Sequence, residues 1–207
     1  MTISVILPAK NESAAIGQTI LKLKSLNIVD EIIVVNDGST DPTETVALQA
    51  GAIVITHPYS KGNGAAIKTG AREAKGNILI FMDADGQHDP QDIPRLLEKI
   101  YQGYDLVVGA RQKGSQASVG RGVANKLYNN LATYMTEHSV EDLTSGFRIV
   151  RADKFKEFLY LLPNGFSYPT TSTMAFFRAG YSVGYVPIHA AKRIGKSHIN
   201  PIKDGIR

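Results

Sequence analysis

The sequence predicts an α/β protein in which helices cover both faces of a mainly parallel sheet. Short apolar runs alternate with segments of helical periodicity up to residue 110, which is the pattern of successive βαβ units. The run 78–82 is apolar at every position, as expected of a strand buried on both faces. The chain has 207 residues and 43% hydrophobic content, enough for one core, so we expect a single domain, 1–207.

The elements up to residue 110 follow one another in regular order. We predict strands over 3–8, 31–35, 52–56, 78–82 and 105–109, and helices over 16–26, 40–50, 65–75 and 93–101. Ser13 or Asn11 is expected to cap the first helix. Asp89 is expected to cap the helix that begins near Pro90, since Asp followed by Pro is a common helix opening.

The pattern changes beyond Arg111. Residues 112–120 are rich in Gly and Ser, and we predict helices over 121–136, 154–162 and 171–179 and strands over 146–150 and 183–187. An apolar stripe at helical spacing is expected in the core: Phe155, Phe158, Leu159 and Leu162. We expect the head of Arg148 to lie in solvent, and His57, His88 and His198 to be surface histidines.

Composition and charge restrict the possible functions. The chain has no Cys, which excludes thiolate chemistry and disulfides and fits a reducing compartment. No stretch approaches the ~20 apolar residues of a membrane span, so we expect a soluble chain. Residues 1–150 hold 14 Lys+Arg and 16 Asp+Glu, whereas residues 151–207 hold 9 and 3. The basic C-terminal part indicates an anionic partner, although a merely solvated basic surface remains an alternative.

Acidic residues follow the apolar run 78–82. Asp83, Asp85 and Asp89, with Gln87 between them, concentrate negative charge just beyond the predicted strand, and their mutual repulsion is relieved if a cation binds. Oxygen ligands without Cys suit Mg²⁺ or Mn²⁺, ions that commonly bridge a few carboxylates to substrate phosphates. We therefore predict a site for a hard metal ion in this segment.

Polar loops follow three of the first four predicted strands. They are 8–12, 36–39 and 83–85, and the carboxyl ends of parallel strands meet at one edge of a sheet, where open α/β folds bind their ligands. Asp37 could accept hydrogen bonds from a nucleobase or a ribose hydroxyl, and Gly38 would let a ligand approach the backbone closely. Together the loops predict a nucleotide site.

The motifs in combination resemble the inverting glycosyltransferases with an A-type fold, and among them most closely the polyprenyl-phosphate (dolichyl-phosphate) hexose synthases. The residues that carry the resemblance are Pro8-Ala-Lys-Asn-Glu12, Val35-Asn-Asp-Gly-Ser-Thr-Asp41, Lys61-Gly-Asn-Gly64, Asp83-Ala-Asp-Gly-Gln-His-Asp-Pro90, Gly109-Ala-Arg111 and Asp142-Leu-Thr-Ser-Gly-Phe-Arg148. The resemblance covers nearly the whole chain. It implies a nucleotide-sugar-binding half, 1–110, and an acceptor-binding half, 111–207, with a basic tail.

The resemblance also implies roles for individual residues. Donor binding falls on Pro8, Ala9, Asn11, Glu12, Asp37, Gly38, Lys61, Gly64, Asp83 and Ala84. Acceptor binding falls on Ser145, Gly146, Lys192, Lys196 and Ser197. Catalytic roles fall on Asp85, Arg111, Asp142 and Arg193, and the metal and diphosphate motif falls on Asp83, Asp85 and Gln87. In the basic loop the chain departs from its relatives, with Lys192 where Arg is common and His198 where Lys is common, so the cation that holds the phosphate is left open.

The activity implied is metal-dependent transfer of a hexose, with inversion, from a UDP- or GDP-hexose to a dolichyl or undecaprenyl phosphate. A lipid monophosphate has a second pKa of ~6 and needs no general base at neutral pH, whereas a sugar hydroxyl does. Asp142 could be that base or a structural turn residue, and both possibilities stay open. The alternatives are transfer to a sugar hydroxyl with Asp142 as base, and an inactive nucleotide-sugar-binding module.

Other function classes fit less well. A nucleic-acid partner is not expected, because the chain has no ribonucleoprotein or helix-turn-helix motif, and a dehydrogenase is disfavoured because Gly-x-Gly-x-x-Gly is missing after the first strand. The absence of Trp disfavours a processive polymer synthase of the Gln-x-x-Arg-Trp type. We expect a cytoplasmic protein, peripheral at the cytoplasmic face of the membrane, that meets the membrane surface or a membrane-protein partner.

Overall fold

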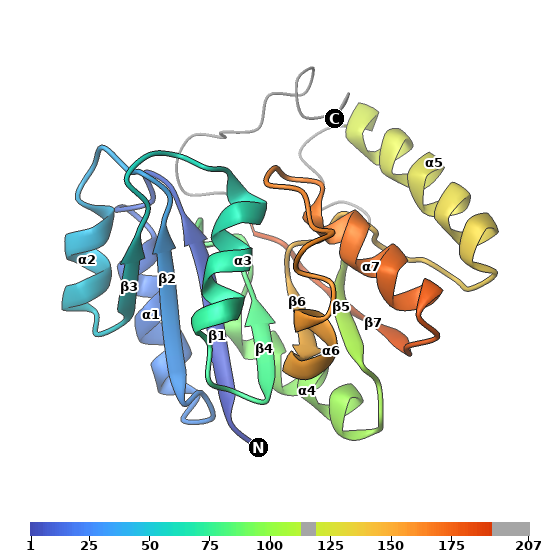
Figure 1. Ribbon diagram of the computed structural model, residues 1–207, viewed down its shortest axis with the longest axis horizontal. Coiled ribbons are helices and arrows are strands. Elements are labelled where there is room, and N and C mark those ends of the chain that lie inside the picture. The colour runs from blue at the N-terminus through green and yellow to red at the C-terminus, as the bar shows by residue number, and fades with distance from the viewer. Residues whose placement is uncertain (113–118, 192–207) are drawn as a thin grey trace.

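The computed structural model describes residues 1–112 and 119–191 (Figure 1). Within these residues a seven-stranded sheet has the order β3-β2-β1-β4-β6-β5-β7. The strands are β1 (Ile3–Ala9), β2 (Glu31–Asn36), β3 (Ile53–Thr56), β4 (Ile78–Phe81), β5 (Leu106–Arg111), β6 (Arg148–Arg151) and β7 (Val183–Ile188). The helices are α1 (Ile16–Ser25), α2 (Thr43–Gln49), α3 (Asn63–Glu73), α4 (Ile93–Tyr101), α5 (Val119–Thr136), α6 (Ala152–Lys156) and α7 (Tyr168–Arg178), with a short 3₁₀ turn, η1 (Pro90–Asp92).

The sheet is mainly parallel, as predicted. Strand β6 pairs antiparallel with both β4 and β5, and every other pair is parallel. The chain builds β1, β2 and β3 toward one edge and then returns to place β4 on the other side of β1. This reversal of direction beside β1 is the position at which α/β sheets form a ligand crevice, at the carboxyl ends of the strands.

Apolar residues form a core on each face of the sheet. On one face, α1 and α4 pack against alternate residues of β1 and β4; on the other, α3, α6 and α7 cover the sheet (Figure 1). Phe81 of β4 contacts Phe155 of α6, with ring centroids 4.6 Å apart. Burial on both faces explains why β4 is apolar at every position.

Two local predictions were wrong and two are confirmed. Neither Asn11 nor Ser13 caps α1, whose N-cap is Ala15 without a side-chain hydrogen bond. The helix predicted over 154–162 is the shorter α6, although Phe155, Leu159 and Leu162 are buried as expected. The Asp89 cap is confirmed, since its side chain accepts a hydrogen bond from the Gln91 N–H. In the part of the chain that the structure describes, no helix combines the length and apolarity needed to cross a bilayer.

Candidate active site

The polar loops predicted to meet do so at the carboxyl edge of the sheet. Backbone bonds and short side chains join the loop after β1 to the loop after β2: the Asp37 N–H donates to the Ala9 carbonyl at 2.8 Å, and the Asn11 N–H donates to Ser39 Oγ at 2.9 Å. The Asn11 Oδ1 atom accepts from the Thr40 N–H at 2.8 Å, and Asn11 itself has a positive φ of 55°. Asn11 therefore joins two loops rather than capping a helix.

Asp37 organises the loop that follows β3. Its Oδ1 atom accepts hydrogen bonds from His57 Nδ1 at 2.7 Å and the Lys61 N–H at 2.8 Å, and its Oδ2 atom accepts from Ser60 Oγ at 2.8 Å and the Gly62 N–H at 2.9 Å. Burial alone would raise the pKa of Asp37, but these hydrogen bonds outweigh it and lower the pKa. The carboxylate is ionised and holds residues 57–62 beside the site.

His57 is buried, which corrects the expectation of a surface histidine. Its side chain bridges Asp37 and Thr69 of α3, with Nε2 3.0 Å from Thr69 Oγ1. Gly38 has a φ of +67°, and a Cβ there would lie 2.7 Å from the Ser60 backbone nitrogen. The backbone that approaches Gly38 closely is therefore that of Tyr59 and Ser60 in the protein's own loop.

The acidic residues after β4 lie beside the loop that precedes β6, residues 142–147. Asp85 is buried, and its Oδ1 atom accepts from the Gln87 N–H at 3.0 Å, whereas the Asp83 side chain is 35% exposed. A Cβ on Gly146 would lie 3.0 Å from Asp83 Oδ2. Ala84 is buried between the two acids, and the Gln87 side-chain amide donates to the Ala191 carbonyl at 3.4 Å.

The residues of this loop suit a hard cation that a ligand would help to hold. Across residues 1–112 and 119–191, no group of three or more His, Cys, Asp or Glu side chains is placed to hold a metal ion. Two carboxylates and an amide supply oxygen ligands only, which matches Mg²⁺ or Mn²⁺ shared with substrate phosphates rather than a complete protein cage. The metal site at Asp83, Asp85 and Gln87 remains a prediction.

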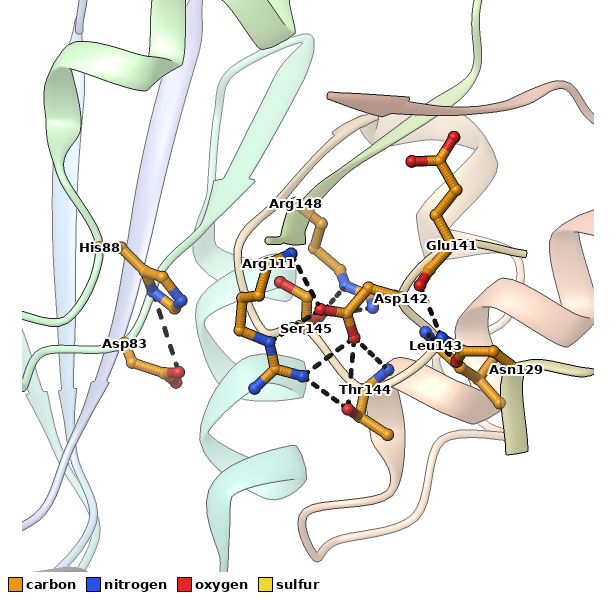
Figure 2. Close-up of polar contacts among 10 residues, drawn as sticks. All are labelled: Asp83, His88, Arg111, Asn129, Glu141, Asp142, Leu143, Thr144, Ser145 and Arg148. Carbon is orange, nitrogen blue, oxygen red and sulfur yellow. Dashed lines mark hydrogen bonds and ion pairs between the residues drawn. The ribbon is translucent and has the colours of Figure 1, made fainter. Parts of the chain in front are cut away.

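Arg111, at the end of β5, forms an ion pair with the buried Asp142 (Figure 2). Arg111 donates from Nε to Asp142 Oδ2 at 2.8 Å and from Nη2 to Oδ1 at 2.9 Å, and its backbone N–H donates to Oδ2 at 3.1 Å. Burial would raise the pKa of Asp142, but the hydrogen bonds and charge of Arg111 override it and lower the pKa. An ionised carboxylate of low pKa is a poor proton acceptor.

Thr144 completes this cluster. Its Oγ1 accepts from Arg111 Nη2 at 2.7 Å, and its N–H donates to Asp142 Oδ1 at 3.2 Å (Figure 2). The Arg111 side chain keeps about a quarter of its surface exposed, 25%. Arg111 is therefore oriented by Asp142 and Thr144 while part of its guanidinium still faces solvent.

Arg148 is completely buried, which corrects the prediction that its head lies in solvent. The guanidinium donates to the Ser145 carbonyl from Nε at 3.1 Å and Nη2 at 2.6 Å, and Nη1 donates to Pro169 O, Ser172 Oγ and Thr173 Oγ1. Burial lowers the pKa of Arg148. Arg148 therefore ties the loop of residues 142–147 to the first turn of α7.

His88 is also buried, contrary to prediction. Its ring stacks on Phe147 with centroids 5.2 Å apart, and Nδ1 lies 4.0 Å from Asp83 Oδ2, without a hydrogen-bond partner among the described residues. Burial lowers the pKa of His88 to about 4, so the ring is neutral near pH 7. Figure 2 shows the His88 ring beside the Asp83 carboxylate.

Of the remaining predicted site residues, some belong to the described part of the chain and others do not. Gly64 packs on the backbone of residues 163–165, where a Cβ would lie 2.1 Å from the Pro163 carbonyl oxygen, and Ser145 Oγ is buried without a partner in the described part of the chain. The backbone N–H of Lys61 is bound to Asp37. The basic-loop residues lie outside the described residues: Lys192, Arg193, Lys196 and Ser197.

Sequence reasoning missed three residues that shape the site. His57 and Ser60 hold Asp37, and Arg148 holds Ser145. Only Arg148 carried a signal, because an arginine inside an otherwise apolar predicted strand must find acceptors if that strand is central.

Comparison with known families identifies the chain. The family model described as glycosyl transferase family 2 matches residues 4–159. The chain belongs to this family. It is therefore a glycosyltransferase, and the predicted A-type fold is confirmed by solved structures of the same architecture.

Among the curated relatives of this family 2 enzyme is an uncharacterized protein of Methanocaldococcus jannaschii, 34% identical over 165 residues, 76% of this chain and 68% of the relative. Another is the undecaprenyl-phosphate 4-deoxy-4-formamido-L-arabinose transferase of Photorhabdus laumondii, 34% identical over 161 residues, 72% of this chain and 49% of the relative. The chain thus matches about half the length of that transferase.

A solved structure of the same fold is glucosyl-3-phosphoglycerate synthase from Mycobacterium tuberculosis. In complex with phosphoglyceric acid it has a TM-score of 0.78 and 26% identity, covering 95% of this chain and 73% of that one. The same synthase has been solved with Mn²⁺, UDP-glucose and phosphoglyceric acid, at a TM-score of 0.77.

Proposed function

We propose that this family 2 glycosyltransferase transfers a hexose, with inversion, from a UDP- or GDP-hexose to a polyprenyl phosphate such as dolichyl or undecaprenyl phosphate. The observation that carries the proposal is the state of Asp142. Both of its oxygens accept from Arg111, and its pKa is lowered. A site whose acceptor-side acid is a poor base suits an acceptor that is already ionised.

The chemistry of the acceptor explains this preference. A phosphate monoester has a second pKa of ~6 and is a dianion at neutral pH, whereas a hydroxyl must lose a proton during attack. In the proposed step a phosphate oxygen attacks the anomeric carbon from the face opposite the leaving group. The new C–O bond forms as the bond to the nucleoside diphosphate breaks, and no proton needs to move.

Two anions must then approach each other, so the site needs positive charge. Asp83, Asp85 and Gln87 would hold Mg²⁺ or Mn²⁺, which would offset the charge of the departing diphosphate. Arg111 is oriented by Asp142 and Thr144 and is partly exposed, which suits it to contact a phosphate. The basic-loop residues Lys192, Arg193 and Lys196 are proposed to add to this charge, with Ser197 as a further contact.

The donor would occupy the crevice between β1 and β4. The proposed contacts are Pro8, Ala9, Asn11, Glu12, Asp37, Gly38, Lys61, Gly64, Asp83 and Ala84. Because the Asp37 carboxylate already accepts four hydrogen bonds, we propose that it acts on the nucleotide chiefly by holding the 57–62 loop in place. Ser145 and Gly146 would face the acceptor phosphate beside Asp83.

The comparisons support the proposal at two points. Curated relatives from Photorhabdus laumondii and Proteus mirabilis, 34% and 35% identical, are named as transferases that use undecaprenyl phosphate. The glucosyl-3-phosphoglycerate synthase, 26% identical, has been solved with Mn²⁺ and UDP-glucose. We further propose that the protein works at the cytoplasmic face of a membrane, as a peripheral protein or with a membrane-protein partner.

One assay tests donor, acceptor and metal together. The protein is incubated with Mn²⁺, a short-chain polyprenyl phosphate and, in parallel, UDP-glucose, UDP-N-acetylglucosamine and GDP-mannose, and release of nucleoside diphosphate is followed with formation of lipid-linked sugar. We expect lipid-dependent release with one donor, abolished by Asp85→Asn and by a chelator.

A hydroxyl acceptor is the competing outcome. Phosphoglyceric acid, which is present in the complex of the solved synthase, serves as the test compound in a parallel reaction. Sugar transfer to phosphoglyceric acid without transfer to the polyprenyl phosphate would contradict the proposal and would favour Asp142 as a general base. Donor hydrolysis dependent on Mn²⁺ would in either case exclude an inactive binding module.

A further inference from the structure

Helix α5 leaves an apolar flank uncovered. Four of its side chains are large, apolar and exposed: Tyr128 at 51%, Leu131 at 53%, Tyr134 at 83% and Met135 at 54%. The helix packs on α7 through Ala132, which is 3% exposed and lies in a small cluster with Met174 and Phe177. In Figure 1, α5 lies at the edge of the molecule, and among the described elements α7 lies beside it.

The helical register places these four side chains together. With 3.6 residues per turn, and measured from Ala132, Tyr128, Met135, Leu131 and Tyr134 lie at about −40°, −60°, −100° and −160° around the axis. Asn129 and Thr133 lie on the other side of Ala132, at about +60° and +100°. The exposed apolar residues thus form one continuous flank.

The polar flank of α5 is used inside the protein. Asn129 Nδ2 donates to the Glu141 carbonyl at 2.6 Å, and Asn129 Oδ1 accepts from the Leu143 N–H at 3.1 Å (Figure 2). Thr133 Oγ1 accepts from the Val140 N–H at 3.0 Å. Surface helices usually turn apolar residues inward and polar residues outward. On α5, the polar residues Asn129 and Thr133 instead bind residues 140–143, and the exposed apolar residues face outward.

We infer that this apolar flank of α5 docks on a bilayer surface that carries anionic lipid. Helix α5, residues 119–136, contains Arg121 and Lys126 and no Asp or Glu, which matches a negatively charged surface. Tyr is also favoured at the boundary between headgroups and acyl chains. This inference rests on the proposed lipid acceptor, because it names the surface by which the enzyme reaches that acceptor.

A second copy of the chain fits the flank less well. Four partly exposed side chains supply on the order of 400 Å², about half of the ~800 Å² per partner in a stable protein–protein interface. Two copies would also bring together like-charged segments. A bilayer needs no matching protein surface, and the Asn129 contacts then hold Asp142 and Arg111 at a fixed place relative to the membrane.

The test compares two variants that add the same charge to α5. Leu131→Glu places a carboxylate on the apolar flank, and Asn130→Glu places one on the exposed polar side. Sedimentation with vesicles of phosphatidylcholine and phosphatidylglycerol in equal amounts measures binding, with pure phosphatidylcholine vesicles as the neutral surface. We expect Leu131→Glu to lose vesicle binding about tenfold or more and Asn130→Glu less than about threefold.

Activity on a water-soluble, short-chain polyprenyl phosphate separates this inference from the proposed function. If both variants keep wild-type turnover on that acceptor, the loss in Leu131→Glu is one of docking. Equal loss of vesicle binding in both variants, or no binding by the wild type, would overturn the docking surface even if turnover is normal. A wild-type dimer in sedimentation velocity that Leu131→Glu dissociates would assign the flank to self-association instead.

Discussion

Replacing Asp142 by Asn tests whether the acceptor-side acid positions Arg111 or takes a proton. The substitution keeps the shape of the side chain and removes its charge. The carboxylate accepts from Arg111 Nε, Nη2 and N–H at 2.8, 2.9 and 3.1 Å and from the Thr144 N–H at 3.2 Å. An amide nitrogen cannot accept, so at least two of these donors lose their acceptor.

The expected loss of stability follows from those contacts. A hydrogen bond to a charged group contributes about 1.5–3 kcal/mol, and removing one partner of a buried ion pair costs about 3–5 kcal/mol. Arg111 is 25% exposed, so water partly replaces the lost acceptor. We expect Asp142→Asn to lower the free energy of unfolding in urea by about 3 kcal/mol at pH 7.

The same contacts predict how this difference depends on pH. The folded-state pKa of Asp142 lies below its ordinary value of 3.8, so its contribution to stability is fully present above pH 3.8 and is lost as the pH falls through the folded pKa. The stability difference between wild type and Asp142→Asn should therefore shrink below about pH 4.

Turnover then separates the two roles. If Asp142 orients Arg111, Asp142→Asn raises the KM for polyprenyl phosphate and lowers kcat by about tenfold, and kcat/KM keeps an inflection near pH ~6 from the acceptor phosphate. Loss of a general base would instead lower kcat by a factor of about 10²–10⁴. A loss of that size with an unchanged KM and no inflection near pH 6 would refute the positioning role.

Asp105→Asn is the matched control. Asp105 is also buried, accepts from Lys154 Nζ at 2.7 Å and from the Ser182 N–H at 2.9 Å, and has a lowered pKa, because its hydrogen bonds outweigh the effect of burial. It lies before the first residue of β5, at the end opposite Arg111. We expect a similar loss of stability and unchanged turnover below the unfolding temperature.

Three further substitutions test the frame around the site. Arg148→Met should cost about 3 kcal/mol in urea unfolding, because the Ser145 and Pro169 carbonyls lose a buried donor; a loss under about 1 kcal/mol would show that water replaces the guanidinium. Gly64→Ala should cost about 2–3 kcal/mol, since a Cβ would lie 2.1 Å from the Pro163 carbonyl oxygen, whereas Gly165→Ala, with nothing within 4 Å, should be nearly neutral. Gly146→Ala adds a Cβ that would lie 3.0 Å from Asp83 Oδ2, so it should shift the Asp83 carboxylate. We expect the affinity for Mn²⁺, measured by electron paramagnetic resonance, to fall about tenfold. Unchanged affinity would argue against Asp83 as a ligand.

The sequence was informative about the sheet because its central parallel strands, β1, β2 and β4, are buried on both faces. Continuous apolar runs therefore marked β1, β2 and β4, and polar loops marked their carboxyl ends. The antiparallel insertion of β6 between β4 and β5 could not be predicted, because pairing depends on which distant strand lies alongside. The cap of α1 was missed because Asn11 and Ser13 bond to the loop after β2 instead.

Within the site, the sequence predicted which residues gather but not what each one contacts. Asp37 and Asp142 both follow the expected motifs, yet each accepts hydrogen bonds from residues far along the chain. Arg148 and His88 were expected in solvent because Arg and His are rarely buried. Their burial depends on acceptors and rings supplied by α7 and by Phe147, which no local pattern records.

The carboxylates at this edge of the sheet differ in how far the protein buries them. Asp37 and Asp142 accept several donors each, have lowered pKa values and stay charged, so they build a rigid, ionised frame. Asp83 keeps about a third of its side-chain surface, 35%, and lies against Gly146, where a cation and an anionic acceptor could meet. If the donor and acceptor phosphates bind here as proposed, cations would be needed to offset the repulsion from this frame of ionised acids. Arg111 is the described cation best placed for this, because Asp142 both fixes its direction and holds its charge.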